Sequence, residues 1–223
     1  RDTYIADRTE FDKQLLVDFY RSRGFIDAQV LGVSSEFSRE RDAFFLTFNV
    51  REGLPYRFNN TAAVSEYEGV DAADFQSALR IRKGVVYSPT AVDTTIARME
   101  AIAQKKGLDF LTVEPRITRN ERDQTLDVTF VLKKGPRIFV ERIDIQGNAT
   151  TLDKVVRRQF HTVEGDPFSP REIREGAERI RALGFFKKAD VNANAGSSED
   201  RVVVDVNVEE KPTGSLNFGA TYS

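Results

Sequence analysis

Few side chains in this sequence have the types and spacing that a catalytic or metal-binding site requires. His161 is the single histidine and the chain contains no cysteine, so we assign neither a histidine and cysteine zinc site nor a Ser-His-Asp triad. The 35 Asp and Glu residues offer acid and base pairs such as a glycosidase uses, but solvated faces of amphipathic helices and strands explain them better. No phosphate-binding or dinucleotide-binding glycine motif occurs. We therefore expect no enzyme, no cofactor and no metal ion.

The overall charge also argues against a nucleic-acid partner. The chain has 33 Lys and Arg residues against 35 Asp and Glu, which gives a formal net charge of −2. Such a balance leaves no excess of positive charge to neutralise phosphates. No apolar run approaches the length of a membrane helix, and no charged-then-apolar leader opens the chain. Because Arg1 falls inside a repeat, we interpret the sequence as a fragment.

The elements that position these side chains recur along the chain. Three helix-periodic segments end at glycines that lie 83 and then 77 residues apart. Two strand-like segments follow each glycine, and a proline marks the exit of each repeat. Serial modules of this kind usually act by presenting surfaces. The glycines are Gly24, Gly107 and Gly184, and the prolines are Pro55, Pro136 and Pro212.

The third repeat begins with a predicted strand and a short helix. Residues 138–146 mix β-branched and charged side chains and stop at Gly147-Asn148, which is typical of a strand that ends in a turn. We expect Thr150 to cap the following helix, with Asp153 three residues later. The apolar face of this helix should consist of Leu152, Val155, Val156 and Phe160.

A second helix and two strands complete the third repeat. Ser169-Pro170 provides a capping serine followed by a proline at the first helical position, and Gly184 provides a left-handed stop. Residues 189–195 and 201–208 alternate in hydrophobicity, as strands with one buried face do. The predicted order is therefore strand, helix, helix, strand, strand.

The first two repeats fit the same order. In the second repeat, we expect strands at 57–64, 111–118 and 126–132 and helices at 71–81 and 89–106. The first repeat contains a helix with Phe11, Leu15 and Phe19 on one face, followed by strands near 28–36 and 43–50. We expect its first strand and helix to precede Arg1. The predicted domains are 1–53, 54–135 and 136–212, with 213–223 as a separate final segment.

Several short motifs of the sequence resemble those of the POTRA domains of the BamA family, the Omp85-type outer-membrane assembly proteins. The resemblance covers the whole chain and is most specific at the Gly-Asn turn, the Leu-Gly-Phe-Phe phrase and the exit from the last repeat. It implies an α+β fold of tandem POTRA modules, each βααββ with a three-stranded mixed sheet packed under two helices. The motifs are residues 140–148, 157–158, 164–166, 183–186 and 210–215.

The resemblance also implies a function and a location. It indicates a chaperone-like scaffold on the periplasmic face of a Gram-negative outer membrane, which receives unfolded outer-membrane proteins and docks accessory lipoproteins. The family places a β-barrel after the last POTRA domain. Residues 213–223 alternate between apolar and polar side chains over about the length of one membrane strand. We therefore expect them to start the first strand of that barrel.

Edge strands are the expected client sites, because unpaired amide and carbonyl groups let an extended client add as a strand. Pro115 cannot donate to a ladder, so its strand should lie at a sheet edge, where it should also weaken client pairing. The alternative is that these edges are solvated or protected. The expected client residues are Ala28, Val30, Val33, Leu111, Val113, Ile117, Ala189, Val191 and Ala193.

The resemblance assigns a second interface to charged residues of the last repeat. Family members contact an essential lipoprotein through an arginine of the first helix and a glutamate of the following loop, which match Arg157 and Glu164. Arg158 and Asp166 are expected neighbours. Gln159 stands where the family often has a glutamate, so the charge pattern differs here. The alternative is an ordinary surface ion pair worth at most ~1 kcal/mol.

Other classes remain as alternatives. The chain is also compatible with the soluble region of a related Omp85 transporter, either TamA-like or a two-partner secretion pore. A KH-like nucleic-acid module shares part of the element order, but its Gly-x-x-Gly loop has no counterpart here and the charge does not fit. A cell-division scaffold with one POTRA-like unit fits the serial repeats poorly.

Overall fold

The computed structural model describes residues 2–212 and follows the order of elements predicted from the sequence. It divides at Gly135 into two units, Arg1–Gly135 and Pro136–Ser223, and each is described by itself. The prediction that 213–223 begin a barrel strand lies outside the described residues. Within residues 2–212, no helix combines the length and the apolar character needed to cross a membrane.

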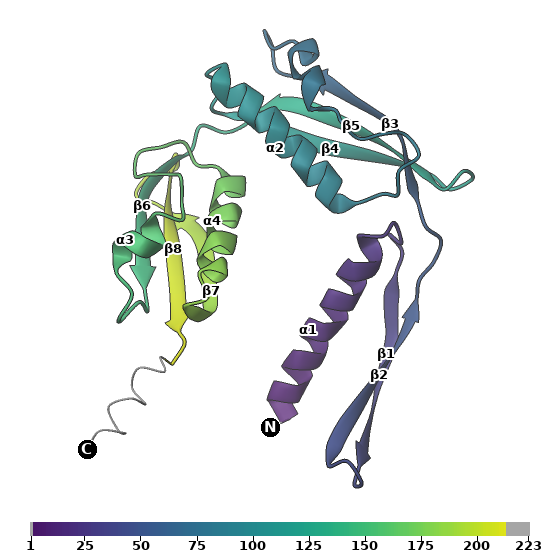
Figure 1. The fold of residues 1–223 in the computed structure, drawn as a ribbon. Helices are drawn as coiled ribbons and strands as arrows, with labels where there is room; N and C mark the ends of the chain where they lie inside the picture. Colours follow the sequence, from purple (N-terminus) through teal and green to yellow (C-terminus); the bar gives the residue numbers. More distant parts are fainter. Residues whose placement is uncertain (1, 213–223) are drawn as a thin grey trace. The chain divides into compact units, whose positions relative to one another are not determined.

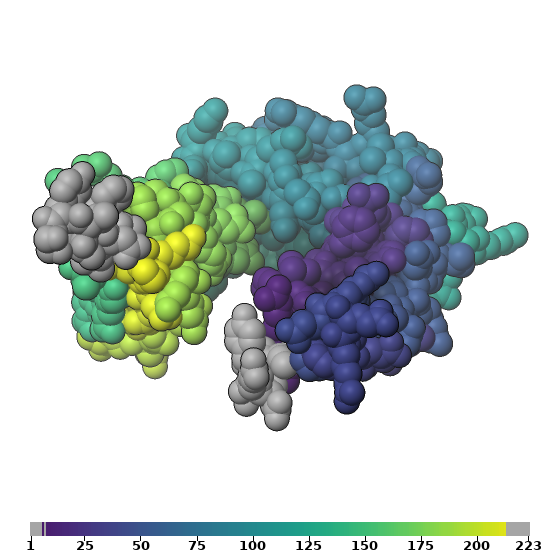
Figure 2. Space-filling model, turned by 60° about the horizontal axis from the view of Figure 1, so that its bottom comes forward, coloured from purple at the N-terminus to yellow at the C-terminus, as the bar shows by residue number. Residues whose placement is uncertain are grey.

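The first unit begins with a helix and a hairpin. Helix α1 (Asp2–Arg21) precedes an antiparallel pair, β1 (Gln29–Ser38) and β2 (Ala43–Arg51) (Figure 1). The side chains of Phe11, Leu15 and Phe19, which the sequence places on one face of this helix, are 63%, 52% and 49% exposed. α1 and the hairpin lie at the surface, in purple and blue (Figure 2).

A complete module follows in the same unit. It comprises β3 (Arg57–Ser65), the 3₁₀ helix η1 (Ala72–Ala78), α2 (Pro89–Lys105), β4 (Leu111–Asn120) and β5 (Thr125–Lys134). The sheet order is β3-β5-β4, with β3 parallel and β4 antiparallel to β5. This is the mixed three-stranded sheet that the POTRA resemblance implied, and it is packed against η1 and α2.

The first helix of this module differs from the prediction for 71–81. It is a 3₁₀ helix rather than an α-helix, and the Asp71 carboxylate accepts a hydrogen bond from the Ala73 amide at its start. Phe75 and Ala78 are its buried residues. Residues three apart line up on a 3₁₀ helix, so this geometry directs both side chains into the core beside Met99 and Phe130.

The second unit has the same topology. Its elements are β6 (Phe139–Gln146), α3 (Asp153–Arg157), α4 (Pro170–Ala182), β7 (Phe186–Ala195) and β8 (Arg201–Glu210). The sheet order is β6-β8-β7, with β6 parallel and β7 antiparallel to β8. The predicted cap at Ser169 is confirmed, because its side chain accepts a hydrogen bond from the Glu172 amide.

The predicted cap at Thr150 is wrong. Helix α3 starts at Asp153 without a side-chain cap, and the hydroxyl and amide of Thr150 donate to the Glu210 carboxylate at 2.8 and 2.9 Å. The Thr151 amide donates to the same carboxylate at 2.8 Å. These bonds hold the Thr150 segment against the end of β8, since hydrogen bonds to a charged acceptor are the stronger ones. Leu152, expected in the core, is consequently 61% exposed.

Burial on the two C-terminal strands is uneven. Val204, Val206 and Val208 of β8 line the core as predicted. On β7, Ala189 is buried, but Val191 is only half-buried and Ala193 is exposed. The buried face of β7 is therefore shorter than the alternation of its residues predicted, and it ends near Val191.

Two glycines fix tight junctions in these units. Gly147 follows β6 with φ of +92°, and a Cβ there would lie 1.9 Å from the Val208 carbonyl oxygen. Gly24 also has a φ of +92°, and its carbonyl accepts a hydrogen bond from the Tyr56 amide at 2.9 Å. Arg119 adds a bidentate pair to Asp27 at 2.9 and 3.2 Å. The 24–28 turn is thereby anchored to the module that follows it.

Candidate functional site

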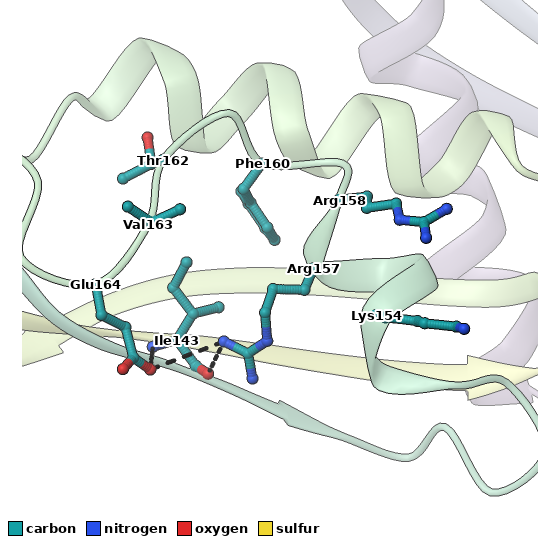
Figure 3. A pocket seen from close by; sticks show the side chains of 8 residues that line it. All are labelled: Ile143, Lys154, Arg157, Arg158, Phe160, Thr162, Val163 and Glu164. Atoms are coloured by element: carbon teal, nitrogen blue, oxygen red, sulfur yellow. Dashed lines mark hydrogen bonds and ion pairs between the residues drawn. The ribbon is translucent and has the colours of Figure 1, made fainter.

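Arg157 and Glu164 converge on one residue of an edge strand. Arg157 ends α3 and donates a hydrogen bond from Nη1 to the Ile143 carbonyl at 3.0 Å. Glu164 lies in the following loop, and its Oε1 accepts the Ile143 amide at 3.4 Å. The two side chains approach each other at 3.8 Å, between Arg157 Nη1 and Glu164 Oε1. They bracket the main chain of β6 as a pair (Figure 3).

This arrangement closes part of the β6 edge. Upstream of Ile143, the loop pairs with β6 through its own backbone: the Val140 amide donates to Asp166 at 2.8 Å and the Gly165 amide donates to Val140 at 2.7 Å. The Phe168 amide donates to the Ile138 carbonyl at 2.7 Å. Because β6 is an edge strand, these groups would otherwise face solvent. The molecule therefore protects β6 with its own loop and side chains.

A hollow of about 710 Å³ opens beside this pair. Phe160 and Ile143 form its apolar floor and are 4% and 2% exposed, whereas Val163 is 64% exposed. Figure 3 shows the Arg158 and Lys154 side chains pointing away from Glu164, on the opposite side of the lining. The combination of an apolar floor and a basic rim suits a partner that presents apolar and acidic side chains together.

The structure brings three of the four predicted docking residues together. Arg157, Arg158 and Glu164 line the same hollow. Asp166 does not line it, and its carboxylate instead accepts the Val163 amide at 3.0 Å within the loop. Lys154 was missed, although its spacing of three and four residues from the two arginines places it near them on a helix.

The predicted client strands lie at sheet edges. β4 and β7 are the outer antiparallel strands of their sheets, and β1 belongs to a two-stranded sheet. The edge position that Pro115 predicted for β4 is confirmed, and pairing with β5 continues through Pro115 opposite Phe130 without a register shift. These edges contain Val30, Val33, Leu111, Val113, Ile117, Val191 and Ala193.

Two of the predicted client residues are less suitable than the sequence indicated. Ala28 precedes β1, is 2% exposed, and donates its amide to the Phe25 carbonyl at 3.2 Å. Its inclusion in an edge strand is wrong, because the turn that joins the hairpin to its module buries it. The Ala189 carbonyl on β7 accepts Arg181 Nη2 at 2.9 Å. Arg181 therefore occupies part of the β7 edge.

Charge covers the exposed side of β4. Arg116 donates to Glu66 at 3.2 and 3.4 Å, and Lys133 bridges Glu66 and Glu114. The hydrogen bond from Lys133 holds the pKa of the exposed Glu114 carboxyl below its ordinary value. These ion pairs link β4 to β5 and to Glu66, which follows β3, across the sheet. Among the described residues, no cluster of three or more acidic or histidine side chains is arranged to hold a metal ion.

Comparison with known proteins identifies these modules. The family model described as POTRA, surface antigen variable number repeat, matches residues 1–53, 60–135 and 138–211. The crystal structure of Haemophilus influenzae BamA POTRA3-5 superposes with a TM-score of 0.55 and 24% identity, covering 91% of this chain and 80% of that chain. This likeness agrees with the βααββ fold.

Curated relatives extend the comparison. The outer membrane protein assembly factor BamA of Neorickettsia risticii (strain Illinois) is 30% identical over 219 residues, which cover 98% of this chain and 29% of the relative. The protein of the same name from Neisseria meningitidis serogroup B is 23% identical over 210 residues, covering 94% of this chain and 26% of the relative. The chain thus spans less than a third of either relative. With its modules matched in series, the chain belongs to the POTRA family.

Proposed function

We propose that this chain is the periplasmic POTRA region of an outer-membrane β-barrel assembly protein. The observation that carries the proposal is the series of POTRA matches over most of the chain, together with relatives that are named outer membrane protein assembly factors. In this proposal, the domains are 1–53, 54–135 and 136–212, and residues 213–223 start the first strand of a barrel. The scaffold stands at the periplasmic face of the outer membrane.

The first proposed task is to receive unfolded outer-membrane proteins. An extended client would pair with the free edges of β1 and β4, since main-chain hydrogen bonds tolerate many client sequences. The β7 edge has a smaller role because Arg181 already binds the Ala189 carbonyl. Each contact is weak, which suits transfer toward a barrel.

The second proposed task is to dock accessory lipoproteins at the hollow beside α3. Arg158 is exposed on its rim, where a partner carboxylate can reach it without breaking the Arg157 and Glu164 bonds to β6. Exposed charges of this kind set partner register and association rate. The apolar floor supplies the buried contact that a specific interface requires.

Charge reversal at Arg158 tests the docking proposal. We expect Arg158→Glu to weaken binding of the purified lipoprotein partner at least tenfold, because it places a carboxylate where the partner's acidic group would lie. Arg174→Glu, which adds the same charge to an exposed position of α4, serves as the control. Circular dichroism should be unchanged for both variants. Equal partner affinities for the two variants would reject this dock.

A further inference from the structure

The middle module contains a second hollow, of about 480 Å³, between residues 80–85 and the first half of α2. Three arginines line it, Arg80, Arg82 and Arg98, and its lining includes no Asp or Glu. Arg80 donates from Nε to the Ser77 carbonyl at 3.3 Å. Within residues 2–212, none of the three guanidinium groups forms an ion pair of 4.0 Å or less. The hollow is therefore strongly basic.

The last module shows which group belongs at this position. Helices α2 and α4 both start with Ser-Pro, so Arg98 corresponds to Arg179 and Ala91 corresponds to Glu172. In the last module, the Glu172 carboxylate accepts Arg179 Nη2 at 2.7 Å and the His161 amide at 2.8 Å. Its side chain is 20% exposed. An internal carboxylate thus joins the start of α4 to the preceding loop.

The middle module keeps the basic groups of this arrangement but lacks the carboxylate. Ala91 provides no acceptor for Arg98, and Arg80 stands at the position of His161, which adds a further positive charge. Ser88 makes no side-chain hydrogen bond to α2, whereas Ser169 caps α4. A hydroxyl, the start of a 17-residue helix and three guanidinium groups therefore surround a position where the sister module places a carboxylate. Such groups favour an anion.

We propose that this hollow binds an acidic side chain of a partner protein, whose carboxylate takes the place that Glu172 occupies in the last module. The apolar lining of the hollow also indicates which residue should stand next to the partner's acidic residue. Val85 is 48% exposed at the hollow, and Phe58 forms a buried floor at 1% exposure. The preferred segment therefore has an apolar residue next to an Asp or Glu. This site does not depend on the assembly function, because any partner with such a segment fits it.

The test uses the whole chain and a blocked peptide, acetyl-Leu-Glu-Glu-Leu-amide, in which the side-chain carboxylates are the anions. Isothermal titration should show binding, and amide chemical shifts should change within 80–94. The peptide with Gln in place of Glu should bind at least tenfold more weakly, because hydrogen bonds to charged groups are lost. Equal binding of both peptides, or no binding of either, would overturn the proposal.

Two substitutions on α2 separate this site from general charge effects. Ala91→Glu should supply the missing carboxylate internally and abolish peptide binding. Ala101→Glu adds the same charge to an exposed position of the same helix outside the hollow, and it should keep the affinity within about twofold. Equal loss in both variants would show long-range electrostatics and contradict a built site. If Ala91→Glu fails to fold, Arg98→Gln provides the second test and should weaken binding about tenfold.

A titration with inorganic phosphate distinguishes a protein segment from a small anion. Phosphate should compete with the peptide only weakly, because it makes no contact with Val85 and Phe58. If phosphate binds as tightly as the peptide and Ala91→Glu abolishes both, the hollow is a site for small anions. The proposal that it binds an acidic side chain of a partner protein then fails. These outcomes do not depend on whether the chain binds unfolded clients or an accessory lipoprotein.

Discussion

The first strands of the two complete modules, β3 and β6, differ in how much of their edge main chain is covered by other groups of the same module. Both β3 and β6 pair at their beginning with the loop before the second helix: the Gly84 amide donates to Phe58 at 2.8 Å, as Gly165 does to Val140 at 2.7 Å. Beyond this pairing, Ile143 is capped by Arg157 and Glu164. In the middle module, Lys83 stands at the Glu164 position.

Charge placement, rather than topology, therefore decides which main-chain and side-chain groups remain available to a partner. A lysine cannot accept an amide hydrogen bond, and within residues 2–212 the Thr61 main chain, which corresponds to Ile143, has no side-chain cap. The same contrast recurs at the second helix, where Glu172 satisfies Arg179 and Ala91 leaves Arg98 without a carboxylate. The last module is more self-contained than the middle one.

The largest expected effect is at the end of the first strand. Gly147→Ala should lower the free energy of unfolding of the last module by about 2–4 kcal/mol, because φ of +92° and a Cβ 1.9 Å from the Val208 carbonyl oxygen are incompatible with alanine. Ser65, at the equivalent position of the middle module, already carries a Cβ, so Ser65→Ala should cost about 1 kcal/mol or less. Urea unfolding monitored by circular dichroism measures both. Similar losses would contradict the steric conflict expected at Gly147.

Removal of the internal carboxylate should have the next largest effect. Glu172→Ala leaves Arg179 and the His161 amide without their acceptor, and we expect a loss of about 1–3 kcal/mol in the stability of the last module. The reverse change in the middle module, Ala91→Glu, should be neutral or stabilising. If Ala91→Glu is destabilising and Glu172→Ala is neutral, the carboxylate does not stabilise this position in either module.

Exchange of the edge cap should have a smaller, local effect. Glu164→Lys introduces the residue of the middle module, and we expect the Ile143 amide to exchange with solvent about tenfold faster, since it loses its acceptor. The Val140 amide should keep its protection, because the Asp166 main chain binds it. Unchanged exchange at Ile143 would show that Glu164 does not close this edge.

The smallest expected effect depends on pH. Hydrogen bonds from the Thr151 amide, followed by those from Thr150, hold the pKa of the Glu210 carboxyl below its ordinary value. Because the folded pKa is depressed, the added stability is present above the unfolded pKa and is lost as pH falls through the folded value. The stability difference between the wild type and Glu210→Gln should therefore vanish in acid. A difference that does not change with pH would exclude the carboxylate bonds as its source.

The sequence predicted most elements because their signals are local. Ser169 and Pro170 start α4 as expected, and Pro115 correctly indicated an edge strand. Thr150 resembles a helix cap locally, but its acceptor is Glu210, sixty residues later. A local motif contains no information about such a competitor. The 3₁₀ geometry of η1, from which Phe75 and Ala78 enter the core, was likewise not predicted.

The candidate site was predictable in part. The resemblance brought Arg157, Arg158 and Glu164 together, and the structure places them around one hollow. The bonds from Arg157 and Glu164 to the Ile143 main chain were not predictable, because they join residues 14 and 21 positions apart that only the folded sheet brings together. Helical periodicity placed Phe11 on an apolar face of α1, but periodicity alone does not indicate whether a sheet covers that face.

The most direct test of the account is an amide chemical-shift titration of the whole chain with a blocked, alternating peptide from an outer-membrane protein strand. We expect broad, weak changes along β1 and β4, and little change from Ile138 to Ile143, where loop and side chains close β6. Changes confined to helix surfaces, strongest changes on β6, or no change at millimolar peptide would contradict it.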